Sequence, residues 1–593
     1  MTTSPPASRA TPAVAHRVAA RLLSLLDDPG AASVPLRLDW AGPVDLPLHS
    51  ERAVQAACGV MEVHGRAAGR PTPLAVDYAG TVAGVLAAQG VSAALLGART
   101  TGAGPAQVRT SVSEAALFGV GQYLAAATAG DDDTAAPVLP AARDLAESAG
   151  HRPFVSADGV PFELEALDAE RWRGFWQRLG APHAAYRAGW RPFQQRFATA
   201  TCLLPQALHR TVETSPYAAI RAAAGQAGAD VLPVRADPAP GTSPGDGGPP
   251  SCCPTPWRLS PLGGYACGDA PARAVPGPLP LAGVRVVEST RRVQGPLAGH
   301  VLRLLGAEVV RIEPPGGDPM RGMPPTAGGC SARFRTLNDG KTVVEADITT
   351  PSGRHTVREL VADAEVFLHN WAPGKAARLG LDAEELTAVR PGLVHAWASG
   401  WGDMPGPTPP VGTDFLVQAH SGLAAALCPA PLPPAPSLMT LTDVLGGLLS
   451  AQTVLAALLA RRRTGRAQRA VSSLLSAASL VPRPRRRVRW GLWEQPVATA
   501  DGYLWLDDAL DDAPLAAGRA GAVLGADAAG CPGTVAARLR SRTSADWSAR
   551  FAEAGLTALA VCTDLAHLAA DPRFAATVTG GEYARPVAPW EFL

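Results

Sequence analysis

The stretch LAGVRVVESTRRVQGPLAGHVLRLLGAEVVRIEPPGGDPMRG, residues 281–322, decides the fold class. VRVVEST from Val284 and EVVRIEP from Glu308 are short apolar runs rich in valine, which are typical of buried strands. Between them, GPLAGHVLRLLGA from Gly295 has the apolar spacing of a helix. A strand, a helix and a second strand in this order predict parallel strands joined by a crossover helix.

The same alternation continues to about residue 400. TPSGRHTVRELVADA from Thr350 reads as a helix, and EVFLHN from Glu365 and LVHAWASG from Leu393 read as strands. Residues 281–400, here called the front block, therefore predict an α/β fold with a doubly wound parallel sheet. Such sheets bind ligands beyond the carboxyl ends of their strands. Those ends hold Thr290–Gln294, Glu313–Gly317, Asn370–Trp371 and Ser399–Gly402.

The rest of the chain contains one unit twice. VQAACGVMEVHG from Val54 is matched by VQAHSGLAAALC from Val417, and each is followed by an aspartate before an apolar helical pattern, Asp77 and Asp443. Three further matches follow in the same order: segments from Ala93 and Ala456, from Phe154 and Val497, and from Ser215 and Ser544. Ordered matches of this kind predict a duplication or a fusion of two relatives.

Composition divides the chain further. A Pro/Gly-rich stretch at 236–280 cannot bury a core and is predicted to be a mobile linker. It separates an N-terminal half from a C-terminal half that alone carries the front block. The predicted domains are an N-terminal extension at 1–44, a partial half at 45–235, the linker, and a fuller half at 281–593, divided into 281–480 and a shortened small domain at 481–593.

Charge and cysteine content exclude several classes of protein. The formal net charge of +1 favours neither nucleic acid nor an anionic membrane surface. No apolar run reaches the roughly 18 residues that span a bilayer. The nine cysteines are scattered without a CxxC pair, which predicts no zinc site, no disulfide framework and a reducing cytoplasm.

Several motifs together resemble family III CoA-transferases, the carnitine dehydratase/bile-acid-inducible (CaiB/BaiF) group. They are the opening stretch and, in the family's order, LNDGKTVVEADITTPSG, EVFLHNWAPGKAARLGL, ASGWG, TDFLVQAHSG and RRRTGRAQ. The resemblance covers about residues 280–590, whereas residues 45–235 resemble only the later part of the family and lack the front block. It implies a Rossmann-like domain with a smaller α/β domain, in two chains that interlock as rings. Its activity would be transfer of CoA from an acyl-CoA to a carboxylate.

The resemblance also implies the catalytic groups. Asp443 holds the position of the family's nucleophile, which would form a mixed anhydride with the acyl group and then an aspartyl-CoA thioester. At a helix N-terminus its backbone N–H groups would also face a developing oxyanion. Asp77 matches this place in the N-terminal half. Either aspartate could instead be an ordinary helix cap.

Coenzyme A contacts are assigned by the same resemblance. Val293 and Gln294 correspond to the residues at the thioester end, and the Gln294 amide suits a carbonyl oxygen. Asn370 and Arg378 match an Asn and an Arg of the family, and an arginine there can bind a CoA phosphate. Glycines and basic residues at family positions complete the set: Gly316, Gly317, Arg321 and Lys341. Each of these has a plainer interpretation as a turn or a surface charge.

Departures from the family leave alternatives open. Thr413 and its counterpart Ser50 replace the histidine with which the family's racemases form a two-base pair, and neither can act as a base near neutral pH. The leading hypothesis is CoA transfer between an acyl-CoA and a small carboxylic acid, without a metal. The alternatives are isomerase, racemase or lyase chemistry with Asp443 as base, and a degenerate CoA-binding or scaffold protein. The N-terminal half is predicted to act as a truncated second subunit in cis, with a homodimer as the other arrangement.

Overall fold

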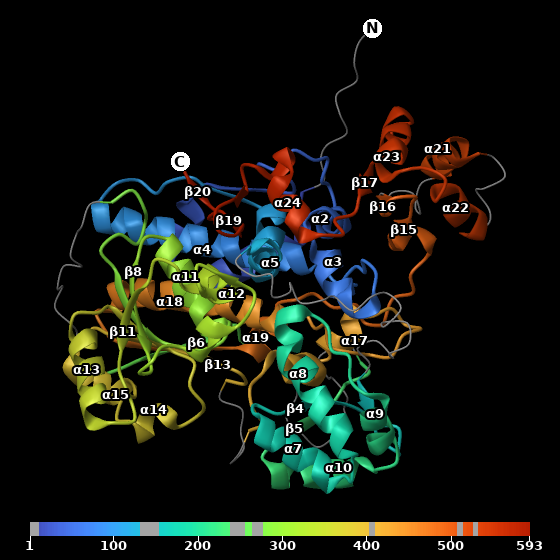
Figure 1. The fold of residues 1–593 in the computed structure, drawn as a ribbon. Coiled ribbons are helices and arrows are strands. Elements are labelled where there is room, and N and C mark those ends of the chain that lie inside the picture. The colour runs from blue at the N-terminus through green and yellow to red at the C-terminus, as the bar shows by residue number, and fades with distance from the viewer. Residues whose placement is uncertain are drawn as a thin grey trace.

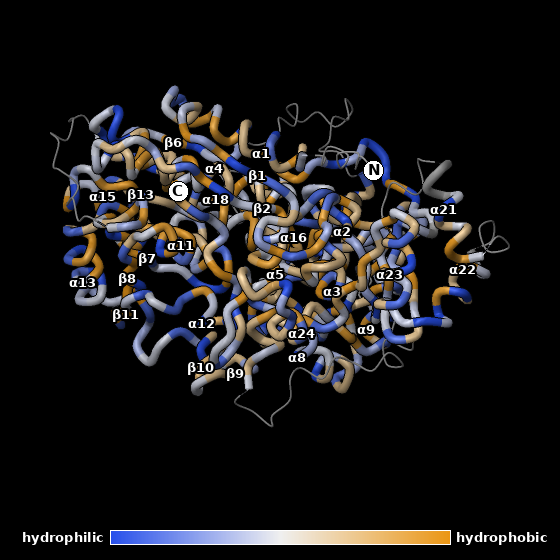
Figure 2. Tube along the Cα trace, turned by 90° about the horizontal axis from the view of Figure 1, so that it is seen from above, coloured by the Kyte–Doolittle hydropathy of each residue, from blue (hydrophilic) through white to orange (hydrophobic). Residues whose placement is uncertain are grey.

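Two long apolar helices form the centre of the molecule (Figure 1). The computed structural model describes residues 11–130, 153–237, 255–263, 277–402, 409–506, 514–525 and 532–593. Helices α4 (Tyr78–Thr101) and α18 (Leu441–Thr464) pack against each other. Both are long and apolar enough to cross a membrane, but 100% and 94% of their most apolar windows are buried inside the protein. Figure 2 shows hydrophobic segments running through the same central region, as expected for core helices.

The front block forms the expected parallel sheet, which confirms the predicted fold class. Its strand order is β11-β8-β7-β12-β13-β14-β6, and all neighbouring strands are parallel except β14 and β6. The bounds are β6 (Trp257–Pro261), β7 (Arg285–Ser289), β8 (Glu308–Glu313), β11 (Thr342–Glu345), β12 (Val366–His369), β13 (Val394–Ser399) and β14 (Gln468–Ser473).

Helices cover both faces of this sheet because successive strand residues point to opposite sides. Val286 joins the core beneath α11 (Gln294–Leu304) and α18, whereas Val287 joins the core beneath α13 (Pro351–Ala362) and α15 (Ala383–Val389). This arrangement brings the carboxyl ends of β7, β8, β12 and β13 to one edge of the sheet.

The predicted linker is not wholly unstructured. Its described residues 255–263 contain β6, which pairs antiparallel with β14 at the edge of the sheet. Trp257 is buried in the main core. The Pro/Gly-rich composition of the linker predicts no packed structure. The segment WRLSP nevertheless contains apolar residues, and it pairs with the free edge of strand β14.

The two halves repeat each other element by element. Helices α2 (Glu51–Ala57) and α3 (Val60–Gly65) correspond to α16 (Asp414–His420) and α17 (Leu423–Leu427). In each pair the helices join at a left-handed glycine, Gly59 or Gly422. Likewise α4 and α18 end at Gly102 and Gly465, both left-handed.

Each half also has a small antiparallel sheet with helices. The N-terminal one comprises β3 (Phe154–Val155), β4 (Pro161–Glu165), β5 (Asp230–Pro233), α7 (Ala169–Arg178), α8 (His183–Thr199), α9 (Gln206–Glu213) and α10 (Tyr217–Ala227). The C-terminal one comprises β15 (Val497–Ala498), β16 (Tyr503–Leu506), β17 (Ala558–Ala560), α21 (Pro514–Leu524), α22 (Pro532–Leu539) and α23 (Ser544–Glu553).

The predicted N-terminal extension is an integral part of the N-terminal half. Helix α1 (Ala13–Ser24) packs on α4 as α11 packs on α18. At Gly84 of α4 an added Cβ would meet Ala15 and Val18, and at Gly447 of α18 it would meet Gln294 and Leu297. Strand β1 (Leu36–Asp39) pairs in parallel with β2 (Val108–Ser111), as β13 does with β14. The N-terminal half therefore keeps a remnant of the front block, which we had expected to be missing altogether.

Each small sheet domain packs on the opposite half. The backbone N–H of Arg235, after β5, donates to the carbonyl of Ala419 in α16 at 3.1 Å. The backbone N–H of Cys562, after β17, donates to the carbonyl of Ala56 in α2 at 2.9 Å. Ala56 and Ala419 are counterparts, so the same contact is made in both directions. The two halves thus interlock within one chain as the two partners of an isologous dimer would.

The close contact of α1 with α4 makes a testable prediction. Replacing Gly84 by alanine would place Cβ 2.6 Å from both the Ala15 carbonyl oxygen and Val18 Cβ. We expect this change to destabilise the protein by about 1–3 kcal/mol in chemical denaturation. Gly119→Ala in α5 (Val112–Thr128) is the matched control, because its Cβ has only an ordinary contact at 3.7 Å. It should be neutral or stabilise by up to about 1 kcal/mol. Equal effects of the two changes would contradict the packing described.

Candidate active site

The carboxylate of Asp443 lines a cavity of about 150 Å³ that both halves build. Asp443 lies in the first turn of α18 and is partly exposed. The C-terminal half also contributes Arg292, Val293, Met320, Met323, Thr413, Asp414, Phe415 and Thr440. The N-terminal half contributes Glu165, Ala166, Leu167, Gln194, Arg196 and Phe197 from its small domain. The cavity is therefore complete only because the two halves interlock.

Asp414, a residue that sequence reasoning did not select, anchors the helix that carries Asp443. Its buried carboxylate accepts hydrogen bonds from the Asp443 backbone N–H (2.7 Å), from Thr442 Oγ1 (2.9 Å) and from the Gln418 side chain. A carboxylate at a helix N-terminus is favourable because it meets the positive end of the helix dipole. The signal was present, since an acidic residue precedes the glutamine of VQA by one helical turn in both copies, as Glu51 and Asp414.

This capping changes one expected role of the helix N-terminus. The backbone N–H of Asp443 is engaged by Asp414, so it is not free to face an oxyanion. The exposed side chain of Arg292 lines the same cavity, and its charge acts on Asp443. Arg292 has a left-handed backbone, with φ of 65°, which is uncommon for a residue with a side chain.

Burial and a neighbouring charge make Asp443 unusually basic. Removal from water raises its pKa well above 3.8, and the nearby Asp414 raises that pKa further, while Arg292 opposes the shift. Burial also raises the pKa of Asp414, to about 6, against the hydrogen bonds that it accepts. Two acidic side chains with raised pKa values in a cleft are typical of a functional site. A more basic carboxylate is a stronger nucleophile or base once it is ionised.

Val293, Gln294 and Asn370 follow the carboxyl ends of β7 and β12. Val293 lines the cavity, and Gln294 starts α11 with its amide nitrogen donating to the Ser399 carbonyl at 3.1 Å. Asn370 does not line this cavity: its side chain both accepts from and donates to the backbone of Arg291, at 3.0 and 2.8 Å. Asn370 therefore fixes the loop that presents Arg292 and Val293.

Other predicted contacts are placed differently. Gly316 and Gly317 both have positive φ and form the turn after β8. Arg321 makes two hydrogen bonds to the Glu313 carboxylate, at 2.8 and 2.9 Å. Lys341 is buried, and its ammonium donates to Glu288, Asn338 and the Pro296 carbonyl. All three donors of Lys341 are used inside the protein, so its role is structural and the predicted CoA contact is wrong for this residue.

A cationic cluster surrounds Arg378, which is exposed at the end of α14 (Lys375–Arg378). Burial lowers the pKa of Lys375, and the charges of Arg291 and Arg378 lower it further, which places three cations near one another. Sequence reasoning chose Arg378 but not Arg291 or Lys375. Clustered cations of this kind suit a phosphate group.

Asp77 is not the counterpart of Asp443. Gln55 binds the backbone of Leu74 as Gln418 binds that of Ser437, and this register aligns Asp77 with Thr440, the residue that precedes α18. Asp443 then aligns with Gly80, whose N–H donates to Glu51 as that of Asp443 donates to Asp414. The interval from Gln55 to Asp77 is indeed shorter than that from Gln418 to Asp443. The N-terminal copy has no carboxylate at the position of Asp443.

Comparisons with known proteins agree with this architecture. The sequence profile of CoA-transferase family III matches residues 42–238 and 281–500, more than half of the chain. This protein therefore belongs to CoA-transferase family III. The two matched segments agree with a duplicated fold.

Individual relatives are similar over part of their length. A succinyl-CoA:glutarate CoA-transferase of Mus musculus is 33% identical over 38% of this chain and 56% of its own length. A probable fatty acyl-CoA transferase of Mycobacterium tuberculosis is 34% identical over 38% of this chain and 64% of its own. The chain thus spans less than two thirds of these relatives. A crystal structure of a CaiB/BaiF family protein from Brucella suis aligns with a TM-score of 0.47 and 27% identity, covering 53% of this chain and 93% of that one.

Proposed function

We propose that this protein transfers CoA from an acyl-CoA to a small carboxylic acid, with Asp443 as the covalent nucleophile. The observation that carries the proposal is the Asp443 carboxylate in a cavity closed by both halves. Its side chain makes no hydrogen bond within the described residues, so its oxygens are open to a substrate. The names of the relatives, among them an acetyl-CoA:oxalate and a succinyl-CoA:glutarate CoA-transferase, support small acids as acceptors.

The first half of the reaction builds an aspartyl thioester. A carboxylate oxygen of Asp443 attacks the thioester carbonyl carbon, the C–S bond breaks, and a mixed anhydride and CoA thiolate result. The thiolate then attacks Cγ of Asp443, which releases the donor acid and leaves CoA on the aspartate. Arg292, beside Asp443, would stabilise the negative charge that develops on oxygen in both steps.

The second half reverses these steps with a new acid. The acceptor carboxylate attacks the aspartyl thioester and expels CoA thiolate, which forms a second mixed anhydride. The thiolate then attacks the acceptor carbonyl, giving the new acyl-CoA and the free Asp443 carboxylate. Neither half consumes water, so a closed cavity favours transfer over hydrolysis. The wall formed by Arg196, Phe197 and Glu165 would serve this purpose.

The remaining residues would position CoA. Arg378, Lys375 and Arg291 carry the charges that phosphate groups require. The turn at Gly316 and Gly317 allows close approach of a ligand to the backbone, since an added Cβ at Gly316 meets nothing within 4 Å. The loop that Asn370 holds presents Arg292 and Val293 to the cavity at Asp443, which suits the thioester end of CoA.

Intact-mass spectrometry tests the proposal. Wild-type protein would be incubated with succinyl-CoA, acetyl-CoA and longer acyl-CoAs, in parallel with Asp443→Asn and the matched control Asp77→Asn. We expect a covalent CoA or acyl adduct in wild type and in Asp77→Asn, and none in Asp443→Asn. An adduct that survives in Asp443→Asn contradicts the assignment. Turnover of an acyl-CoA without any adduct would favour isomerase chemistry, with Asp443 as a base.

A further inference from the structure

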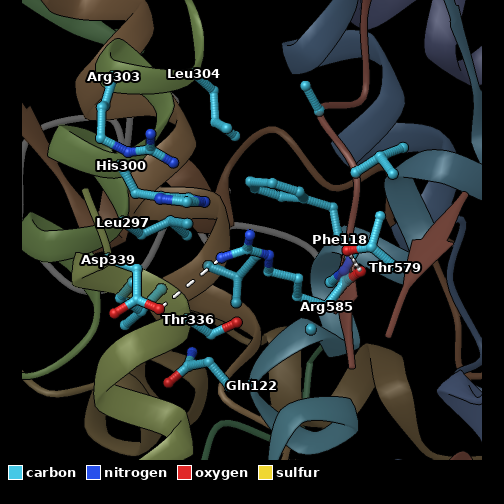
Figure 3. Close-up of a pocket in the computed structure, with 16 residues that line it drawn as sticks. Phe118, Gln122, Leu297, His300, Arg303, Leu304, Thr336, Asp339, Thr579 and Arg585 are labelled. Carbon is cyan, nitrogen blue, oxygen red and sulfur yellow. Dashed lines mark hydrogen bonds and ion pairs between the residues drawn. The ribbon is translucent and has the colours of Figure 1, made fainter. Parts of the chain in front are cut away.

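A second cavity, of about 230 Å³, is lined by residues of both halves (Figure 3). Asp443 lines the first cavity, and its neighbour Val444 lines the second. The walls come from α5 of the N-terminal half, from α11, from α12 (Ala332–Asn338) with the following Asp339, and from the strands β18 (Val578–Thr579) and β19 (Arg585–Pro586). The two cavities share no lining residue.

Unpaired polar groups line this cavity. Nδ1 of His300 and Nε of Arg303 are both buried without a hydrogen-bond partner among the described residues. Buried polar atoms are normally hydrogen-bonded, so such groups point to a partner that the chain itself does not supply. In Figure 3 the side chains of His300, Arg303 and Arg585 all lie around the cavity.

The cavity also carries excess positive charge. Arg303 has no ion pair among the described residues, and Arg585 lies 3.9 Å from Asp339. The same oxygen of Asp339 lies 3.4 Å from Arg335 and accepts a hydrogen bond from Tyr583 at 2.6 Å. Arg335 also pairs with Glu582, so two carboxylates, Asp339 and Glu582, face the three arginines. One positive charge is left in excess. Burial lowers the pKa of Arg303, and repulsion by Arg585 lowers it further.

The remaining wall is apolar and the space is small. Phe118, whose ring stacks on His300 at 6.2 Å, faces Leu297 and Leu304. The volume of about 230 Å³ is below the range of about 300–1,000 Å³ that is usual for drug-sized ligands, which suits a small molecule. Burial lowers the pKa of His300 well below 6.5, so its ring is neutral and adds no further charge.

We propose that this cavity is a second binding site, for a small monocarboxylate with a short apolar or aromatic body, held through its carboxylate by Arg303 and Arg585. A carboxylate pairs with guanidinium groups through two parallel hydrogen bonds and matches the one uncompensated charge. Its apolar body would fill the space beside Phe118 and Leu297. Inorganic phosphate has the charge but lacks a body to cover the apolar wall.

Ligand binding to the full-length protein tests this site. Benzoate and butanoate would be titrated by calorimetry and saturation-transfer NMR, with benzamide, butanamide and inorganic phosphate as comparisons. We expect both carboxylates to bind at least about tenfold more tightly than their amides and than phosphate. The proposal is overturned if the acids and their amides bind equally, or if phosphate binds more tightly than the acids. It is also overturned if neither carboxylate binds at millimolar concentration. None of these outcomes requires a variant protein.

Variants then locate the bound acid. Arg303→Met and Arg585→Met should each weaken benzoate binding by about tenfold or more, whereas the exposed Arg540→Met should not change it. Asp443→Asn should bind benzoate as wild type does. Loss of binding in Asp443→Asn alone would place the acid in the candidate active site and overturn the proposal. The Asp443→Asn variant lacks the proposed nucleophile. Benzoate binding to this variant therefore tests the second site whether or not the protein transfers CoA.

Discussion

Replacing Asp443 by asparagine should lower kcat for CoA transfer by about 10³- to 10⁶-fold, the range found when a covalent nucleophile is removed. The amide keeps the size of the side chain and leaves the backbone hydrogen bond to Asp414 in place. The KM for the acyl-CoA should therefore change little. Formation of the new acyl-CoA, followed by chromatography with each acyl donor and acid, measures the effect.

Asp77→Asn is the matched control for this prediction. Asp77 precedes α4 at the position that Thr440 occupies before α18, and it does not line the cavity. We expect its kcat to stay within about threefold of wild type, since it contacts no reacting group. A large loss in Asp77→Asn with normal turnover in Asp443→Asn would mean that the N-terminal copy holds the working site.

Replacing Arg311 by methionine should cause the largest loss of stability. Arg311 on β8 is 1% exposed, and its guanidinium binds Glu288 (2.9 Å), Glu313 (3.0 Å) and Asp318 (2.6 Å). Removing the cation takes from Asp318 its ion pair with Arg311, and leaves Glu288 and Glu313 to Lys341 and Arg321 alone. Breaking a buried pair costs about 3–5 kcal/mol, and we expect at least this much in urea unfolding.

Arg540→Met is the comparison for Arg311→Met, because the Arg540 side chain is exposed. It should change the free energy of unfolding by less than about 0.5 kcal/mol. The midpoint of thermal unfolding should fall in Arg311→Met and stay in place in Arg540→Met. If Arg311→Met unfolded like wild type, the buried charge network would not hold the strands β7 and β8 together as described.

The sequence was sufficient to predict the strands and helices of the front block, because each is encoded by residues that are neighbours in the chain. Runs such as VRVVEST and EVVRIEP reveal strands by their own composition, and the spacing in GPLAGHVLRLLGA reveals a helix. Order along the chain then predicts parallel pairing. Strand β6 was missed for the opposite reason, since it is a short segment whose place depends on a sheet edge built by distant residues.

The candidate site was only partly predictable. Asp443, Val293 and Gln294 stood out through motifs, and the fold brings all three to the N-terminal ends of α11 and α18. Lys341 looked like a free surface cation, because nothing in its neighbourhood in sequence shows that Glu288 lies beside it. Asp414, Arg292 and Arg196 lie at the cavity because they contact residues that are distant in the sequence. No local sequence pattern predicts such contacts.

The sequence by itself determined the class of sheet and the duplication of the halves, because periodicity and motifs depend on neighbouring residues. It also selected Asp443 as a candidate nucleophile, through the resemblance of the surrounding motifs. Only the tertiary structure decided that Asp77 aligns with Thr440 and that Gly80 stands at the position of Asp443. It also decided that the N-terminal small domain closes the cavity at Asp443. These features depend on the register between packed helices, which hydrogen bonds and close contacts fix across distant parts of the chain.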